Sequence, residues 1–269
     1  DADFESRLRA ADVVLVTNMG VGLDSPFLER LERWLYAYHP KYWIDVVEPK
    51  KTDILYRNLD EDKRVLLESY RRTSGVMNYV RLINGAFSTK PTSEWEEPDP
   101  IPWQAIMGRE GNIYETYDEF MDAEGHRDWP SIAVYFYRDE WIMGDIEYQQ
   151  ALFEEIYKHQ YNPIIFYGQY GSNPRVGIPN MKLSMNHLFG KDEFPFDVLI
   201  NTCKFSFQSL GAQTLEELKL QDVPIVQGYT IYMDEKSWAE NPQGVTPLDV
   251  NLSISQPELD GVIQGGVVA

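Results

Sequence analysis

The chain has 269 residues, of which 43% are hydrophobic and 25% charged, so its composition excludes a disordered or fibrous protein and suits roughly two folded domains. Its 43 acidic and 24 basic residues give a formal net charge of −19, whose sign disfavours nucleic acid as a partner. The single cysteine, Cys203, excludes an intrachain disulfide and any multi-cysteine metal site. No Walker A or G-x-G-x-x-G sequence occurs, so no nucleotide site is predicted in this chain.

The first hundred residues predict an α/β unit. A continuous apolar run at 12–17 is typical of a strand buried on both faces, Ser25-Pro26 starts a predicted helix, and a second strand over 42–47 completes a βαβ unit. Residues 60–87 predict helix with a break near Ser74-Gly75. We therefore predict an N-terminal unit over 1–100 with a helical extension and a proline-rich linker at its end.

Residues 101–130 form a predicted acidic connector, and a second unit is predicted over 131–269 that continues beyond this chain. Its predicted elements are strands over 132–137, 162–167, 196–201 and 223–227, helices beginning near 144 and 215, and an edge strand over 250–255. This alternation predicts an α/β fold of two Rossmann- or flavodoxin-like units with mostly parallel sheets. The missing initiator Met leads us to expect a piece of a longer protein.

Ligands of open parallel sheets bind beyond the carboxyl ends of the strands, so the residues there are the candidates for a site. Arg138 and Trp141 follow the first strand of the second unit, and Arg138 could hold a ligand carboxylate or pair with a neighbouring acid. Phe207 follows the third strand, where it could lie against a flat ligand or pack beneath the loop, and Gln227 ends the fourth.

His187 is the candidate metal ligand. It follows two methionines in Met181-Lys-Leu-Ser-Met-Asn-His187, and both residue types can be axial ligands of a porphyrin-bound metal, although a surface histidine on a short helix is an alternative. The four histidines form no H-x-x-x-H or H-E-x-x-H pair, which disfavours a self-contained zinc site. No catalytic residue is assigned.

Several segments occur in the order typical of one family. They are 131–145, 162–166, 197–201, 218–227, Trp238, 244–247 and 256–261. This order resembles the large tetrapyrrole-binding subunit of class I chelatases, which includes CobN, BchH/ChlH and HmuS-like proteins. The most specific segment is Pro257-Glu-Leu-Asp-Gly261, and Glu115 stands where many members have histidine. The chain resembles an N-terminal-side fragment of such a subunit.

The resemblance implies that the parent protein binds a tetrapyrrole, namely a corrinoid, a porphyrin or haem, while cobalt or magnesium is inserted or iron is removed. Its implied partners are the remainder of the large subunit and AAA+ ATPase subunits. The family default is cytoplasmic, with a periplasmic or membrane-associated location for a haem-uptake member. Arg138, Trp141, Phe207, Gln227 and His187 are the predicted tetrapyrrole-binding residues.

Two other functions fit the sequence. The chain could be a non-catalytic module that binds a tetrapyrrole or another small molecule, with no turnover by the isolated fragment. Two α/β units around a linker would also suit a hinged periplasmic-type receptor, but the segment 257–261 favours the chelatase family.

Overall fold

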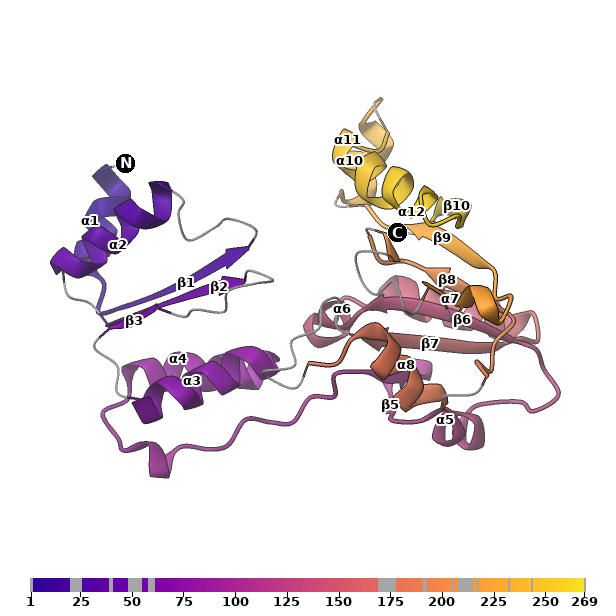
Figure 1. The fold of residues 1–269 in the computed structure, drawn as a ribbon, viewed down its shortest axis with the longest axis horizontal. Coiled ribbons are helices and arrows are strands. Elements are labelled where there is room, and N and C mark those ends of the chain that lie inside the picture. The colour runs from indigo at the N-terminus through magenta and orange to yellow at the C-terminus, as the bar shows by residue number, and fades with distance from the viewer. Residues whose placement is uncertain are drawn as a thin grey trace. The chain divides into compact units, whose positions relative to one another are not determined.

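The computed structural model describes residues 2–19, 26–38, 41–47, 55–57, 61–168, 178–190, 193–204, 206–207, 215–216, 218–231, 233–242 and 244–268. The chain forms two compact units, Asp1–Ile101 and Pro102–Ala269 (Figure 1).

The first unit holds a three-stranded sheet in the order β1-β2-β3. The predicted βαβ arrangement is confirmed, because β1 runs parallel to β2 with α2 between them in sequence, while β3 is antiparallel to β2. The elements are α1 (Ala2–Ala10), β1 (Val13–Met19), α2 (Pro26–Tyr38), β2 (Lys41–Val47), β3 (Leu55–Arg57), α3 (Glu61–Thr73), α4 (Val76–Phe87) and the 3-10 turn η1 (Thr92–Glu94).

Helices α3 and α4 pack against each other and against the segment that follows them. The predicted break between them is confirmed: Ser74 and Gly75 have φ angles of 65° and 89°, in the left-handed region that ends a helix. Leu67 and Tyr70 of α3 and Leu82 of α4 are buried together, with Trp95 packed against them. This small core anchors the proline-rich segment to the first unit.

The second unit holds a seven-stranded sheet in the order β10-β9-β8-β6-β7-β4-β5. Its parallel strands, numbered along the chain from β6, lie in the order 2-1-3-4-5, the flavodoxin-like order. The predicted α/β fold is thus confirmed. The strands are β4 (Ala105–Met107), β5 (Ile113–Tyr114), β6 (Ser131–Tyr137), β7 (Asn162–Gly168), β8 (Val198–Asn201), β9 (Ile225–Tyr229) and β10 (Ile263–Val267).

Helices cover both faces of this sheet, with α8 in front and α7 behind in Figure 1. All seven residues of β7 are buried, as its continuous apolar sequence predicts. The helical elements are η2 (Arg109–Gly111), α5 (Tyr117–Ala123), α6 (Arg138–Met143), α7 (Glu147–Lys158), α8 (Met181–Phe189), α10 (Glu235–Glu240), α11 (Pro247–Asp249), the π-helix η4 (Val250–Ser255) and α12 (Gln256–Glu258). Among the described helices, none has the length and apolar character needed to cross a bilayer.

The stretch predicted as a connector, 101–130, belongs mostly to the second unit. Strand β4 pairs antiparallel with β7, and β5 pairs with β4, so this stretch extends the sheet at one edge. The three residues of β4 are fully buried. The acidic part forms α5, where Thr116 and Glu119 make a capping box. The unit boundary therefore falls at 101/102.

The predicted edge strand over 250–255 is wrong, because these residues form the π-helix η4. A helix starts just before them at Thr246, whose side chain accepts a hydrogen bond from the Asp249 backbone, with Pro247 in the first helical turn. The helical turns that begin there continue through η4 into α12. The alternating apolar residues at 250–255 therefore do not form a strand, because the helix that starts at Thr246 continues through them.

Candidate functional site

The carboxyl ends of β6 and β8 lie side by side at the point where the strand order reverses. Strand β6 pairs with β7 on one side and with β8 on the other, so the crossover after β7 passes to the opposite side of β6. The Thr202 backbone N–H and hydroxyl both donate to the Tyr135 carbonyl, at 3.0 and 2.9 Å. In doubly wound sheets this position is where ligands bind.

Glu140 stands at this position in a network of hydrogen bonds. The Tyr148 hydroxyl and the Gln149 amide both donate to Glu140 Oε2, at 2.7 and 2.6 Å. The Tyr148 oxygen also lies 3.0 Å from Thr202 Oγ1, which joins the carboxyl group to the end of β8. Helix α6, the start of α7 and β8 thus all contribute to one polar cluster.

Burial raises the pKa of Glu140 to about 7. The negative charges of Asp145 and Asp139 raise it further, while the hydrogen bonds from Tyr148 and Gln149 lower it without cancelling the effect of burial. Burial also raises the pKa of Tyr148, which keeps its hydroxyl protonated as the donor to Glu140. A carboxyl group that titrates near neutral pH can both accept and release a proton.

A second polar network is fully buried beside β8 and β9. Asn201 Nδ2 donates to Gln227 Oε1 at 2.7 Å, and both amides donate to the Cys203 carbonyl. Burial raises the pKa of the Cys203 thiol well above its usual value. Because a nucleophilic cysteine must be a thiolate, Cys203 has a structural role in this site.

Two buried carboxylates tie the segment after β8 to the C-terminal helices. Lys204 Nζ lies 3.0 Å from Asp249 Oδ1, and both side chains are buried. Asp260, in the segment that carries the family resemblance, accepts hydrogen bonds from the Ser206 hydroxyl at 2.9 Å and from the Phe207 backbone at 2.5 Å. The segment 257–261 therefore helps to position the chain at the carboxyl end of β8.

The two predicted site residues after β6 lie near Tyr167. The Arg138 side chain is buried, its guanidinium lies 4.4 Å from the centre of the Trp103 ring, and its Nε donates to the Pro102 carbonyl at 2.8 Å. Trp141 is half-buried and stacks on Tyr167, with ring centres 5.2 Å apart. Arg138 thus packs within the second unit, and Trp141 stays partly exposed.

The other three predicted residues do not share a surface. Phe207 and Gln227 are fully buried, while His187 is exposed on α8. Phe205, the other aromatic residue after the third predicted strand, lies outside the described residues. Ligand binding by Arg138, Trp141, Phe207, Gln227 and His187 stays a prediction, and a ligand reaching Phe207 or Gln227 would require the surrounding packing to open.

Glu140 was not among the site residues predicted from the sequence, although it lies in the same segment, 137–145, as the predicted Arg138 and Trp141. The available signal was the group of three carboxylates beside a predicted strand end. The sequence does not show which distant residues lie beside this segment in the fold. Thr202, which contacts Tyr148, is 54 residues away from it along the chain. Which of the three carboxylates is buried depends on how α6 packs.

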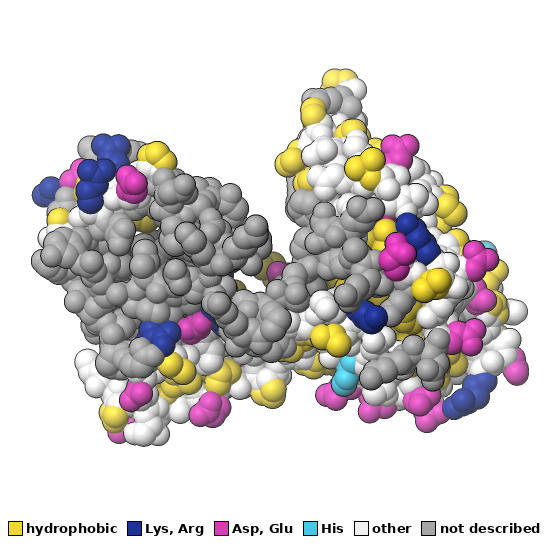
Figure 2. Space-filling view, in the orientation of Figure 1, with side chains coloured by type: hydrophobic (Ala, Val, Ile, Leu, Met, Phe, Trp, Pro, Cys, Tyr) yellow, Lys and Arg dark blue, Asp and Glu magenta, His cyan; other side chains and the backbone are white. Residues whose placement is uncertain are grey.

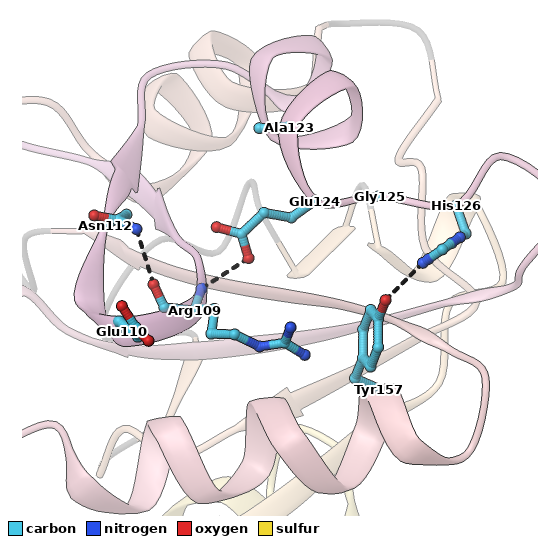
Figure 3. A pocket seen from close by; sticks show the side chains of 8 residues that line it. All are labelled: Arg109, Glu110, Asn112, Ala123, Glu124, Gly125, His126 and Tyr157. Atoms are coloured by element: carbon cyan, nitrogen blue, oxygen red, sulfur yellow. Dashed lines mark hydrogen bonds between the residues drawn. The ribbon is translucent and has the colours of Figure 1, made fainter.

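A surface pocket of about 480 Å³ lies at the opposite end of the strands. Figure 3 shows the Glu124 carboxylate directed at the Arg109 backbone and the His126 ring facing the Tyr157 hydroxyl, at 2.8 Å in each case. Arg109 also pairs with Glu154. The hydrogen bond from Tyr114 to Glu124 raises the pKa of Tyr114 to about 12. We place the candidate site at Glu140 instead, because Glu140 stands at the carboxyl ends of the parallel strands, where the strand order reverses, and its pKa is raised to about 7.

Among the described residues, no group of three or more His, Cys, Asp or Glu side chains is positioned to hold a metal ion. The fold and the site define the second unit as a doubly wound α/β protein with a carboxyl group that titrates near neutral pH at its topological switch point.

Comparison with known proteins identifies the family. The CobN/Magnesium Chelatase model matches residues 68–269, and the chain belongs to this family. An uncharacterised protein of Methanocaldococcus jannaschii is 31% identical over 221 residues, which cover 77% of this chain and 18% of that protein. The aerobic cobaltochelatase subunit CobN of Pseudomonas aeruginosa is 23% identical over 176 residues, or 63% of this chain and 13% of that subunit.

The fold is also similar to that of a solved structure. The catalytic subunit of cobaltochelatase from Mycobacterium tuberculosis matches with a TM-score of 0.57 and 18% identity, over 98% of this chain and 21% of that one. The chain spans less than a fifth of the length of the two curated relatives. The predicted family is confirmed, and the chain is a chelatase-type sequence that matches part of a large subunit.

Proposed function

We propose that this chain is part of a chelatase large subunit that binds a tetrapyrrole for metal insertion, with Glu140 exchanging protons during the reaction. The observation that carries this proposal is a carboxyl group of pKa about 7 at the switch point of a CobN-family fold. Inserting a divalent metal into a free-base macrocycle releases two pyrrole protons to a base. A group half-ionised at neutral pH suits that transfer.

Cobalt insertion into a corrinoid is the first candidate reaction, because the names of two similar proteins refer to cobaltochelatase. Magnesium insertion and iron removal from haem are the other reactions that the family resemblance implies. The remainder of the large subunit and AAA+ ATPase subunits are the proposed partners. Arg138, Trp141, Phe207, Gln227 and His187 are kept as proposed tetrapyrrole contacts, with His187 as a proposed metal contact.

The experiment uses the full-length parent subunit with its partner subunits. Absorbance titrations with a corrinoid, a free-base porphyrin and haem identify the macrocycle, and absence of binding by all three contradicts the proposal. The variant Glu140→Gln keeps the size and hydrogen-bonding capacity of the side chain but cannot ionise. It should bind the macrocycle normally and insert metal about 100-fold more slowly, the lower range for loss of an acid–base group.

The matched control is Asp128→Asn, which removes one carboxylate from an exposed position. It should insert metal at the rate of the unmodified protein. If Glu140→Gln also inserts metal at that rate over the whole pH range, Glu140 has no part in proton transfer.

A non-catalytic binding module is the second candidate for the chain itself. This function is favoured because the chain covers only 21% of the solved relative. The rest of such a subunit could then supply the groups that carry out the chemistry. A Glu140→Gln variant with normal insertion but altered macrocycle affinity would support this function.

A further inference from the structure

Helix α4 of the first unit carries apolar residues on both its faces, together with one buried asparagine, Asn78, and one exposed asparagine, Asn84. Its buried face packs on α3 and Trp95 through Leu82 and Gly85, and Ala86 is also buried. On the other face, Val76, Val80, Ile83 and Phe87 are 70%, 42%, 53% and 60% exposed.

The exposed face of α4 carries no charge. Every residue of α4 is described, and its single charged side chain, Arg81, is paired with Glu96 and Asp99. Helix α7 is the internal comparison, since its exposed residues include Glu147, Glu154, Glu155 and Lys158. Figure 2 shows hydrophobic side chains among those exposed on the lower part of the first unit, where Figure 1 places α3, α4 and the segment after them.

The spacing of the exposed residues indicates what would cover them. Val76, Val80, Ile83 and Phe87 are separated by four, three and four positions, the spacing of a seam that packs against another helix. Met77 and Tyr79 flank this seam and are also exposed, at 54% and 40%. Contiguous exposed apolar surface of this kind marks an interface.

We propose that an apolar helix from the part of the large subunit outside these 269 residues packs on this face of α4. The matched relatives supply the reason for choosing the same polypeptide: this chain matches 21% of the solved cobaltochelatase subunit and 18% of the archaeal protein, so about four-fifths of such a subunit is available to cover it. An uncharged seam matches an apolar helix better than it matches an acidic or basic partner surface.

Cysteine accessibility in the full-length parent subunit tests this contact. Ile83→Cys places a thiol in the seam, and Ala151→Cys places one on the exposed face of α7 as the matched control. Both sites are exposed in this chain, so neither substitution disturbs a core. Cys203 is fully buried and adds little background. With a maleimide probe, the thiol at position 83 should react at least about tenfold more slowly than the thiol at 151.

Equal labelling rates at the two positions overturn the proposal. The labelling is repeated over a wide range of dilution, because a contact within one polypeptide does not depend on protein concentration. Protection at position 83 that persists on dilution supports the proposal. Protection that is lost on dilution assigns the face to a second copy or a separate subunit and also overturns it. Neither outcome depends on the activity of Glu140.

Discussion

Glu140 is the residue whose ionisation most affects both chemistry and stability. Its pKa of about 7 in the folded state is above the ordinary glutamate value of 4.5, so the native state binds its proton more tightly than the unfolded state does. The free energy of unfolding should therefore fall as the pH rises from about 4.5 to about 7 and then level off. This direction is opposite to that of a salt-bridged carboxylate.

The variant Glu140→Gln should remove that pH dependence. Because Gln resembles the protonated acid, the variant should match the unmodified protein below about pH 4.5 and exceed its stability above pH 7 by about 1–3 kcal/mol. Urea unfolding at three pH values measures the difference. Asp128→Asn, at an exposed position, should keep the original profile. A Glu140→Gln profile parallel to that of the unmodified protein would show that Glu140 is not desolvated.

The buried pair of Lys204 and Asp249 should show strong coupling. Burial alone would raise the pKa of Asp249, but the hydrogen bonds from Thr246 and Lys204 outweigh it and hold the pKa below its usual range. Lys204→Met leaves the carboxylate without its cation and should cost about 3–5 kcal/mol. The double variant Lys204→Met/Asp249→Leu should recover most of that loss in urea unfolding, and additive losses would contradict the coupling.

At the residue scale, the sequence allowed the segment 137–145 to be recognised but not the role of each side chain in it. Arg138 was chosen for its charge, yet it is buried against Trp103. Gln227 was chosen for its place at a strand end, and its amide bonds to Asn201. Both choices needed knowledge of tertiary neighbours, which one sequence does not contain.

Among the elements, the C-terminal helical segment is attached to the chain after β8 through Asp260. Its carboxylate accepts the Ser206 hydroxyl and the Phe207 backbone N–H, and the group is buried. Asp260→Ala leaves a buried N–H without its acceptor and should lower the free energy of unfolding by about 1–3 kcal/mol. Leu259→Ala, next to it and 80% exposed, is the control and should have little effect. Equal effects of the two substitutions would show that the hydrogen bonds to Asp260 do not stabilise the fold.

The strands of the second unit were predictable because continuous apolar runs identify buried parallel strands, as in β6 and β7. The short strand β4 was not predicted, since three apolar residues carry too little pattern to distinguish a strand from a loop. The prediction for residues 250–255 was wrong because period-two alternation occurs there by chance within a helix. The helix start at Thr246-Pro247, which the sequence analysis did not use, would have predicted the helix.

For the whole molecule, the net charge of −19 predicts a salt-dependent stability. Raising KCl from about 0.01 M to about 0.15 M shortens the screening length from about 30 Å to about 8 Å and should raise the melting temperature by a few degrees. Differential scanning fluorimetry measures it. Tetramethylammonium chloride should have the same effect, because screening does not depend on the cation. A fall in melting temperature would mean that surface ion pairs outweigh the net repulsion.

The strand order that brings Tyr135 next to Thr202 also sets when the site can form. These residues are 67 positions apart, and the tie between Ser206 and Asp260 spans another 54. Contacts of such high sequence separation close late, because the entropy of the intervening loop must be lost first. During synthesis, the hydrogen-bonded cluster around Glu140 cannot be completed until Thr202 has left the ribosome, and the segment after β8 is held by Asp260 only later. A nascent chain that ends before Asp260 would contain β6 and β7. It would lack the hydrogen bonds from Ser206 and Phe207 to Asp260 that hold the segment after β8.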